Sequence, residues 1–281
     1  MSLGREVPHL LTTWARFTML LPFLLVVLAA ASLAWPWPEL DLSFFGWTAG
    51  CALFQSLSNL CLVAAFRWIP FSRVAVFAKL EVAMTPLVGL LFFSEVPSVG
   101  AGIGIALCLA GALALSRAGR GGRASAPPAR GVLLSLAAAA SVVFASFLLK
   151  KATAEFVSAN RDLSDGPAHF LAAVHVLVNA SWMQAAVLLV WIRVRAPHQL
   201  RFLATHRRGM LRLGAAAAVC STCWFWAYSL QQVAYVKAVG QIEMVVVVLF
   251  SHFLLGERDL RKQLPAMGVV LCGILLVLLG G

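Results

Sequence analysis

Runs of about twenty apolar residues recur along this chain, and charged residues, glycine or proline bound each run. An α-helix needs about 20 such residues to cross the hydrocarbon core of a bilayer, because it rises about 1.5 Å per residue. Each run therefore predicts a membrane-spanning helix. We predict nine of them, at residues 10–34, 44–66, 71–93, 98–116, 131–154, 168–192, 210–230, 234–255 and 263–280.

The composition agrees with this pattern. Of 281 residues, 61% are hydrophobic and 12% are charged, and the mean hydropathy is +0.90. Soluble domains carry about 25% charged residues, so an ordinary soluble enzyme is excluded. The sequence predicts an all-α polytopic membrane protein whose surroundings are the lipid bilayer.

The charges predict an orientation. Arginines in the loops carry most of the net charge of +11. The N-terminal segment and the even-numbered loops hold 17 Lys and Arg residues, whereas the other side holds Lys150, Lys151, Arg161 and Lys237. The positive-inside rule makes the arginine-rich side cytoplasmic. We expect a multi-pass protein of the cell (inner) membrane.

The basic loops lack the interleaved aromatic residues of a groove that binds single-stranded nucleic acid, so no nucleic-acid partner is predicted.

Two distant stretches of the sequence match each other. KLEVAMTPLVGLLFFSE (79–95) and QIEMVVVVLFSHFLLGE (241–257) align Glu81 with Glu243, and Glu95 with Glu257, at one offset of 162 residues. An offset of five helices turns the second copy upside down in the membrane, which makes an inverted-topology repeat. We expect a four-helix half at residues 1–118, a basic linker at 119–130 and a five-helix half at 131–281.

The first glutamate of each stretch lies deep in a predicted span. Glu81 follows Arg73 by eight residues and precedes Glu95 by fourteen, so it lies roughly 12 Å and 21 Å from the two interfaces. An ionised carboxylate there costs at least about 2.5–3.5 kcal/mol on insertion scales and should face the protein interior or a wet cavity. Glu81 and Glu243 either line a central substrate site, with protons as a candidate coupling ion, or hold helices together.

Other side chains join this candidate site with weaker support. Lys79 points away from Glu81, so it could pair with Glu243, bind an anionic substrate group or extend to the interface. Gln241 occupies the matching position and is a further substrate-binding candidate. Trp224 and Tyr228 share a helix face that could stack on a planar substrate, although such aromatics commonly serve packing. Asn59 completes the polar candidates.

The remaining chemistry-bearing residues are interpreted as structural. Glu95 and Glu257 are expected to cap the helix that follows each of them. Cys220 and Cys223 form a C-x-x-C inside a span, where small packing residues are the simpler reading. The sequence offers no nucleophile–base set and no metal-ligand cluster. We therefore predict no enzyme activity, no catalytic residue, no metal and no cofactor.

The blocks Glu81…Pro86…Ser94-Glu95 and Glu243…Gly256-Glu257, each followed by a glycine-spaced helix, resemble the EamA-type branch of the drug/metabolite transporter superfamily. The segment TWARFTMLLPF (13–23) resembles that family's second helix. The resemblance implies a ten-helix bundle of two inverted halves that moves small metabolites through a central cavity. The helix expected before TWARF is missing, which leaves four spans in the first half.

The sequence therefore predicts a membrane transporter for a small organic metabolite, with export as one candidate direction. Its predicted partners are the small-molecule substrate and lipid, with a homodimer as a candidate assembly. The alternative is a membrane scaffold that transports nothing, or a truncated, inactive transporter.

Overall fold

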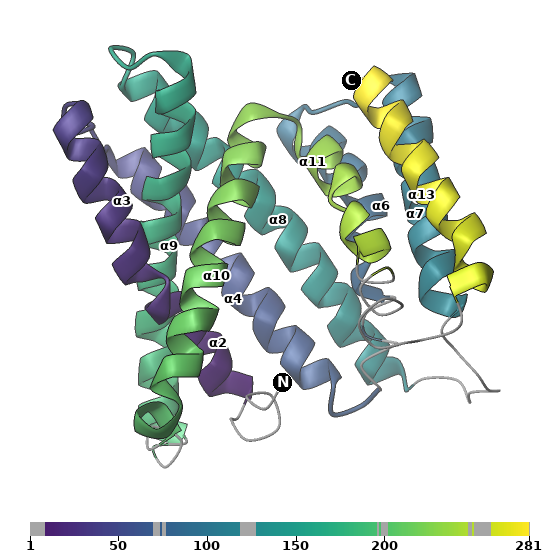
Figure 1. Cartoon of the computed structure of the whole chain (residues 1–281), viewed down its shortest axis with the longest axis horizontal. Helices are drawn as coiled ribbons and strands as arrows, with labels where there is room; N and C mark the ends of the chain where they lie inside the picture. Colours follow the sequence, from purple (N-terminus) through teal and green to yellow (C-terminus); the bar gives the residue numbers. More distant parts are fainter. Residues whose placement is uncertain are drawn as a thin grey trace. The chain divides into compact units, whose positions relative to one another are not determined.

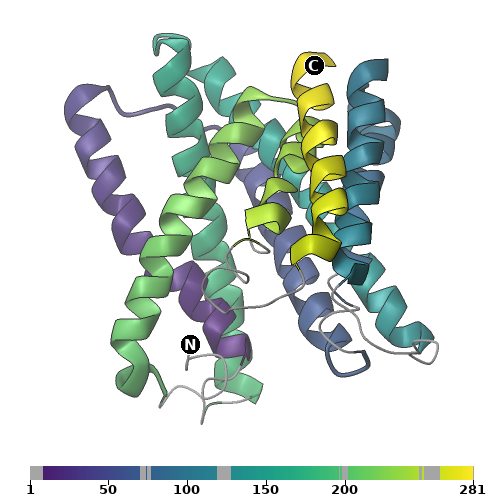
Figure 2. The same cartoon turned by 45° about the vertical axis from the view of Figure 1, so that its right-hand side comes forward.

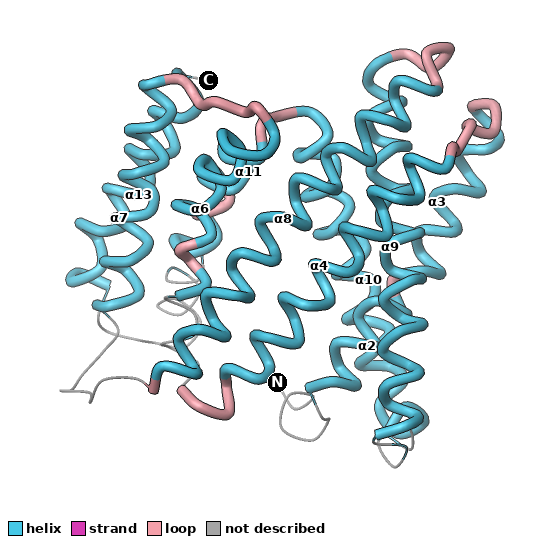
Figure 3. Tube along the Cα trace, turned by 180° about the vertical axis from the view of Figure 1, so that it is seen from behind, coloured by secondary structure: helices cyan, strands magenta, loops and turns pink. Residues whose placement is uncertain are grey.

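The computed structural model describes residues 9–69, 74, 77–118, 128–195, 197, 202–246, 249 and 260–280. Helices joined by turns make up this part of the chain, which contains no strand (Figure 3). The predicted all-α class is thereby confirmed for the described residues. The chain divides into two compact units. Unit 1 comprises Met1–Asn59 and Ala145–Leu230, and unit 2 comprises Leu60–Phe144 and Gln231–Gly281.

Unit 1 is built around the contact between an N-terminal helix and two later ones. Its helices are α2 (His9–Met19), α3 (Leu21–Ala34), α9 (Asp165–Arg195) and α10 (Phe202–Leu230). The first part of α4 (Leu42–Ala65) and the last part of α8 (Ala129–Ala159) complete it. Its buried cluster is Leu11, Trp14, Ala15, Phe17, Ala185, Leu188, Ile192 and Met210. Trp14 Nε1 donates a hydrogen bond to the carbonyl oxygen of Ala185 at 3.1 Å, which satisfies the buried indole.

The predicted first helix is two helices. α2 ends at Met19 and α3 begins at Leu21, with Pro22 in the first turn of α3. Proline lacks the N–H that would continue the helical ladder, and this explains the interruption. Residues Thr13–Ala34 nevertheless form one apolar stretch long enough to span a membrane.

Unit 2 contains a closely packed pair of helices. Its helices are α6 (Glu81–Val88), the π-helical turn η1 (Gly89–Phe93), α7 (Val99–Ala118), α11 (Val233–Val239) and α13 (Leu260–Gly280). α7 and α13 run side by side (Figures 1 and 2). Glycines make this approach possible, since a Cβ on Gly104 would lie 2.7 Å from the carbonyl oxygen of Gly273.

Among the described residues, five helical segments are long and apolar enough to cross a membrane. They are Thr13–Ala34, Leu42–Ala65, Ala129–Ala159, Gly166–Val194 and Arg208–Leu230. Glu81–Phe93, Val99–Ala114 and Leu264–Gly280 are shorter apolar helices. Each predicted helix coincides with helical residues, but the helices predicted at 71–93 and 234–255 are interrupted. These candidate spans agree with the predicted polytopic membrane protein, and the count of nine spans stays a prediction.

Candidate substrate site

The helix predicted at residues 71–93 is broken next to Glu81. Lys79 and Leu80 form a turn, and α6 begins at Glu81. Around this turn the backbone bonds connect residues three apart: Val82 N donates to Lys79 O at 3.2 Å and Ala83 N to Leu80 O at 3.0 Å. The N-terminus of a helix carries partial positive charge, so it favours the carboxylate of Glu81 in its first turn.

The helix predicted at residues 234–255 is broken in the same way. α11 ends at Val239, Gly240 and Gln241 form a turn, and residues 242–246 are helical again. Met244 N donates to Gln241 O at 3.0 Å. Like the bond from Val82 to Lys79, this bond connects residues three apart, and both of its residues lie 162 positions later in the chain. Both copies of the repeated stretch therefore break at corresponding positions, and each places its glutamate just after the break.

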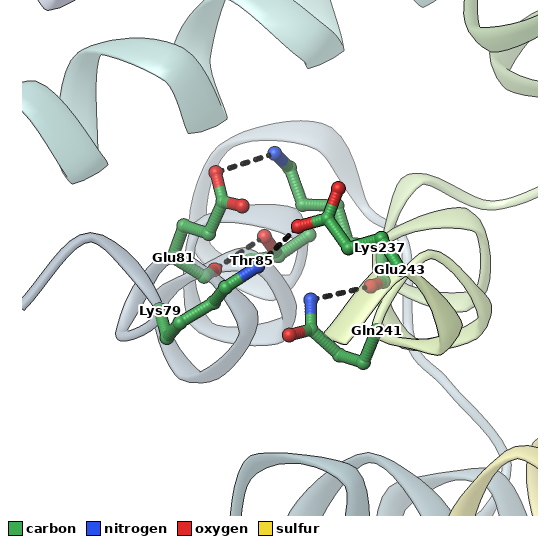
Figure 4. A network of polar contacts seen from close by, with 6 residues as sticks. All are labelled: Lys79, Glu81, Thr85, Lys237, Gln241 and Glu243. Carbon is green, nitrogen blue, oxygen red and sulfur yellow. Dashed lines mark hydrogen bonds and ion pairs between the residues drawn. The ribbon is translucent and has the colours of Figure 1, made fainter. Parts of the chain in front are cut away.

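Two ion pairs join the broken helices in a crossed arrangement (Figure 4). Lys79 Nζ pairs with Glu243 Oε1. Lys237 Nζ, from α11, pairs with Glu81 Oε2 at 3.1 Å. Each broken helix thus contributes one cation and one anion, and the four side chains are neutral in sum. This mutual compensation lowers the cost of burying Lys237 and of holding its partner Glu81 beside it.

Two neutral polar side chains border the ion pairs. Thr85 Oγ1 donates to the carbonyl oxygen of Glu81 at 2.6 Å, which fixes the first turn of α6. Gln241 Nε2 donates to the carbonyl oxygen of Lys237 at 3.1 Å. The amide oxygen of Gln241 is buried and accepts no hydrogen bond. The site therefore holds one unsatisfied acceptor beside its charged groups.

Of the residues predicted for the site, Glu81, Glu243, Lys79 and Gln241 lie together in unit 2. Among the alternatives for Lys79, the structure shows the pairing with Glu243. Trp224, Tyr228 and Asn59 belong to unit 1. The rings of Trp224 and Tyr228 lie 5.8 Å apart between centroids, and Asn59 Nδ2 donates within its own helix to Gln55 O at 2.8 Å.

Sequence reasoning missed Lys237 because the residue had been assigned to the charges outside the membrane. In the structure its side chain is buried against Glu81. The available signal was its position on α11, six residues before Glu243 and inside the apolar stretch predicted to be a span.

Glu95 caps a different helix from the one expected. Its Oε2 accepts a hydrogen bond at 3.1 Å from the backbone N–H of Val233, the first residue of α11. Ser98, rather than Glu95, caps α7, because its Oγ accepts from Ala101 N at 3.1 Å. The connection 94–98 lies against the start of α11, and this brings the Glu95 carboxylate to another helix. Glu257 lies outside the described residues.

The described residues contain no group of three His, Cys, Asp or Glu side chains that could hold a metal ion. Cys220 and Cys223 are free thiols on α10 and are exposed at the surface of the described structure. The charged and polar side chains of the site offer ionic recognition and hydrogen bonding.

The described chain is helical, holds candidate membrane spans and contains two broken helices that meet through ion pairs. Residues 2–117 match the EamA-like transporter family. This match confirms, over residues 2–117, the resemblance seen in the sequence.

Twenty-four chains of solved structures are similar to this protein. One is described only as the crystal structure of a protein; the similarity has a TM-score of 0.73 and 17% sequence identity, and covers 99% of this chain and 91% of that chain. That likeness concerns the fold alone. No curated protein matches the chain.

Proposed function

We propose that this protein transports a small organic metabolite and that the crossed ion pairs of unit 2 form its substrate site. The observation that carries the proposal is the coincidence of two helix breaks with two oppositely oriented Lys–Glu pairs. Secondary transporters commonly place their substrate sites at interrupted helices near the bilayer midplane. The EamA-like match supports the general activity.

The network suits a site that must open and close. Each pair keeps its two charges neutralised while no substrate is bound, and a polar substrate can replace one partner of a pair. Because the two broken helices meet through these side chains, substrate binding would change what holds them together. The matching positions of the breaks support an inverted repeat as part of this proposal. Protons are the proposed coupling ion.

The test is small-molecule profiling of medium and extract from cells that express the protein. Wild type is compared with Glu81→Gln/Glu243→Gln and with empty vector. Glu39→Gln serves as the matched control, because Glu39 is an exposed carboxylate in unit 1. We expect one compound to change its distribution with wild type and with Glu39→Gln, but not with the double variant. The side on which it accumulates gives the direction of transport, for which we propose export.

Equal membrane abundance of all variants, measured by immunoblot of isolated membranes, makes the comparison valid. If wild type and empty vector give the same profile for every compound, the proposal is wrong and the scaffold interpretation takes its place. If the double variant still moves the compound, the protein is a transporter but its site lies elsewhere.

A further inference from the structure

The two ion pairs differ sharply in their exposure. Lys237 is 4% exposed and its partner Glu81 is 23% exposed. Lys79 is 13% exposed, whereas its partner Glu243 is 57% exposed. A buried pair cannot separate without leaving an uncompensated charge in an apolar environment. In the second pair the carboxylate of Glu243 is more than half exposed, so a ligand can reach it and take over its charge. Of the two pairs, that of Lys79 and Glu243 is therefore the one whose carboxylate can exchange partners.

A second observation points to the kind of group that would exchange. Gln241, two residues before Glu243, is 3% exposed, and its buried amide oxygen accepts no hydrogen bond. A buried acceptor without a donor is costly, so a bound group with N–H donors would stabilise this site. The short segment from Gln241 to Glu243 thus offers a carboxylate and an amide oxygen, both of which are acceptors.

We propose that Glu243 and the amide oxygen of Gln241 form a subsite for a primary ammonium group, and that Lys79 occupies it as a tethered internal cation. This inference rests on the proposed function and names a chemical class for the substrate. An ammonium group carries three donors, which can serve the carboxylate and the amide oxygen together. Within the same site, the buried pair of Lys237 and Glu81 joins α6 to α11.

The arrangement predicts an unusual effect of losing Lys79. The internal cation competes with an external one, so its removal should strengthen the binding of ammonium ligands. A purely structural Lys79 would give the opposite result, because its loss would weaken the contact between the broken helices.

The probe is n-propylammonium chloride, with n-propanol and sodium propionate as neutral and anionic counterparts at constant ionic strength. Thermal unfolding of the full chain in detergent, followed by tryptophan fluorescence, reports binding through the rise in Tm. We expect propylammonium to raise the Tm of wild type more than either counterpart does. Lys79→Gln should lower the half-maximal propylammonium concentration about two- to fivefold, the size expected from releasing a partly exposed pair. Glu243→Gln should abolish the response.

A control variant separates the subsite from general charge effects. Lys151→Gln removes an exposed positive charge in unit 1 and should leave the half-maximal concentration unchanged.

Three results would each overturn the inference. They are a Tm response to propylammonium that persists in Glu243→Gln, a weaker response in Lys79→Gln, and no response in wild type. If propylammonium fails while metabolite profiling still depends on Glu81 and Glu243, the proposed function stands and only the ammonium subsite is wrong. If propylammonium binds but no metabolite moves, the subsite stands and transport is wrong.

Discussion

Ser94 adopts a backbone conformation that serine rarely takes. Its φ of 54° and ψ of 26° lie in the left-handed region, and it is the one non-glycine residue with positive φ in the described part of the chain. The backbone N–H of Ser94 donates to Gly89 O, which closes the end of η1. Helices commonly end this way with a glycine, because glycine has no Cβ to clash. The matching residue of the second copy, 162 positions later, is Gly256.

Ser94→Gly should stabilise the protein by about 0.5–1 kcal/mol, because it removes the left-handed strain of a residue with a Cβ. Ser94→Ala keeps the Cβ and serves as the control, which should not gain stability. The measurement is the Tm in detergent. A gain with alanine equal to that with glycine would show that the serine hydroxyl, rather than the backbone, limits stability.

The candidate site shows how far single residues could be predicted. The matching offsets predicted that Glu81 and Glu243 share a role, and the side-chain direction of Lys79 predicted that it could reach Glu243. Lys237 was not predicted as a site residue, because a lysine near the expected end of a span looks the same in sequence whether it faces solvent or another helix. The partner that neutralises it comes from a segment 156 residues away.

At the scale of the helix, the packing of α7 against α13 depends on backbone contact. A Cβ on Gly273 would lie 2.7 Å from the backbone nitrogen of Cys108 and 2.8 Å from the carbonyl oxygen of Gly104. Neither atom belongs to a flexible side chain that could move away. Gly268, on the same helix, has no atom within 4 Å of the corresponding position.

These two glycines form a matched pair for substitution. Gly273→Ala should destabilise the protein by about 1–3 kcal/mol, because α13 must shift away from α7. Gly268→Ala should be neutral or stabilise by up to about 1 kcal/mol, since alanine has the higher helix propensity. Thermal unfolding of both variants in detergent measures the difference. Equal effects of the two substitutions would contradict the close backbone contact.

The broken helices were the element that sequence reasoning described least well. Apolar periodicity continues through Leu80 and through Ile242, so hydropathy indicates one helix where the structure has two short ones. The break is stabilised by contacts that it makes possible, since Lys79 at one turn reaches Glu243 beside the other. These contacts join two segments that are far apart in the chain. The sequence of either segment alone therefore does not predict the break.

At the scale of the whole molecule, the loop charges make an orientation testable. The turn that contains Ser164 connects α8 to α9 and is exposed. It lies on the side with few positive charges, whereas Ser125 belongs to the basic linker by sequence. The positive-inside rule places these two serines on opposite sides of the membrane.

Ser164→Cys should react with a membrane-impermeant maleimide in intact cells, and Ser125→Cys only after the cells are permeabilised. Labelling of the unmodified chain gives the background from its six native cysteines. The reverse pattern would place the arginine-rich side outside the cell and would show that the charge distribution does not orient this protein.

The sequence by itself determined the all-α membrane class and the approximate positions of the helices. It also determined that Glu81 and Glu243 occupy matching positions in two similar stretches. These properties depend on hydrophobicity and on repeated local patterns, which are carried by neighbouring residues. The tertiary structure decided where the helices break, which lysine neutralises which glutamate, and that Glu95 caps α11. Each of these depends on charges and donors from segments far apart in the chain, and only folding brings them within bonding distance.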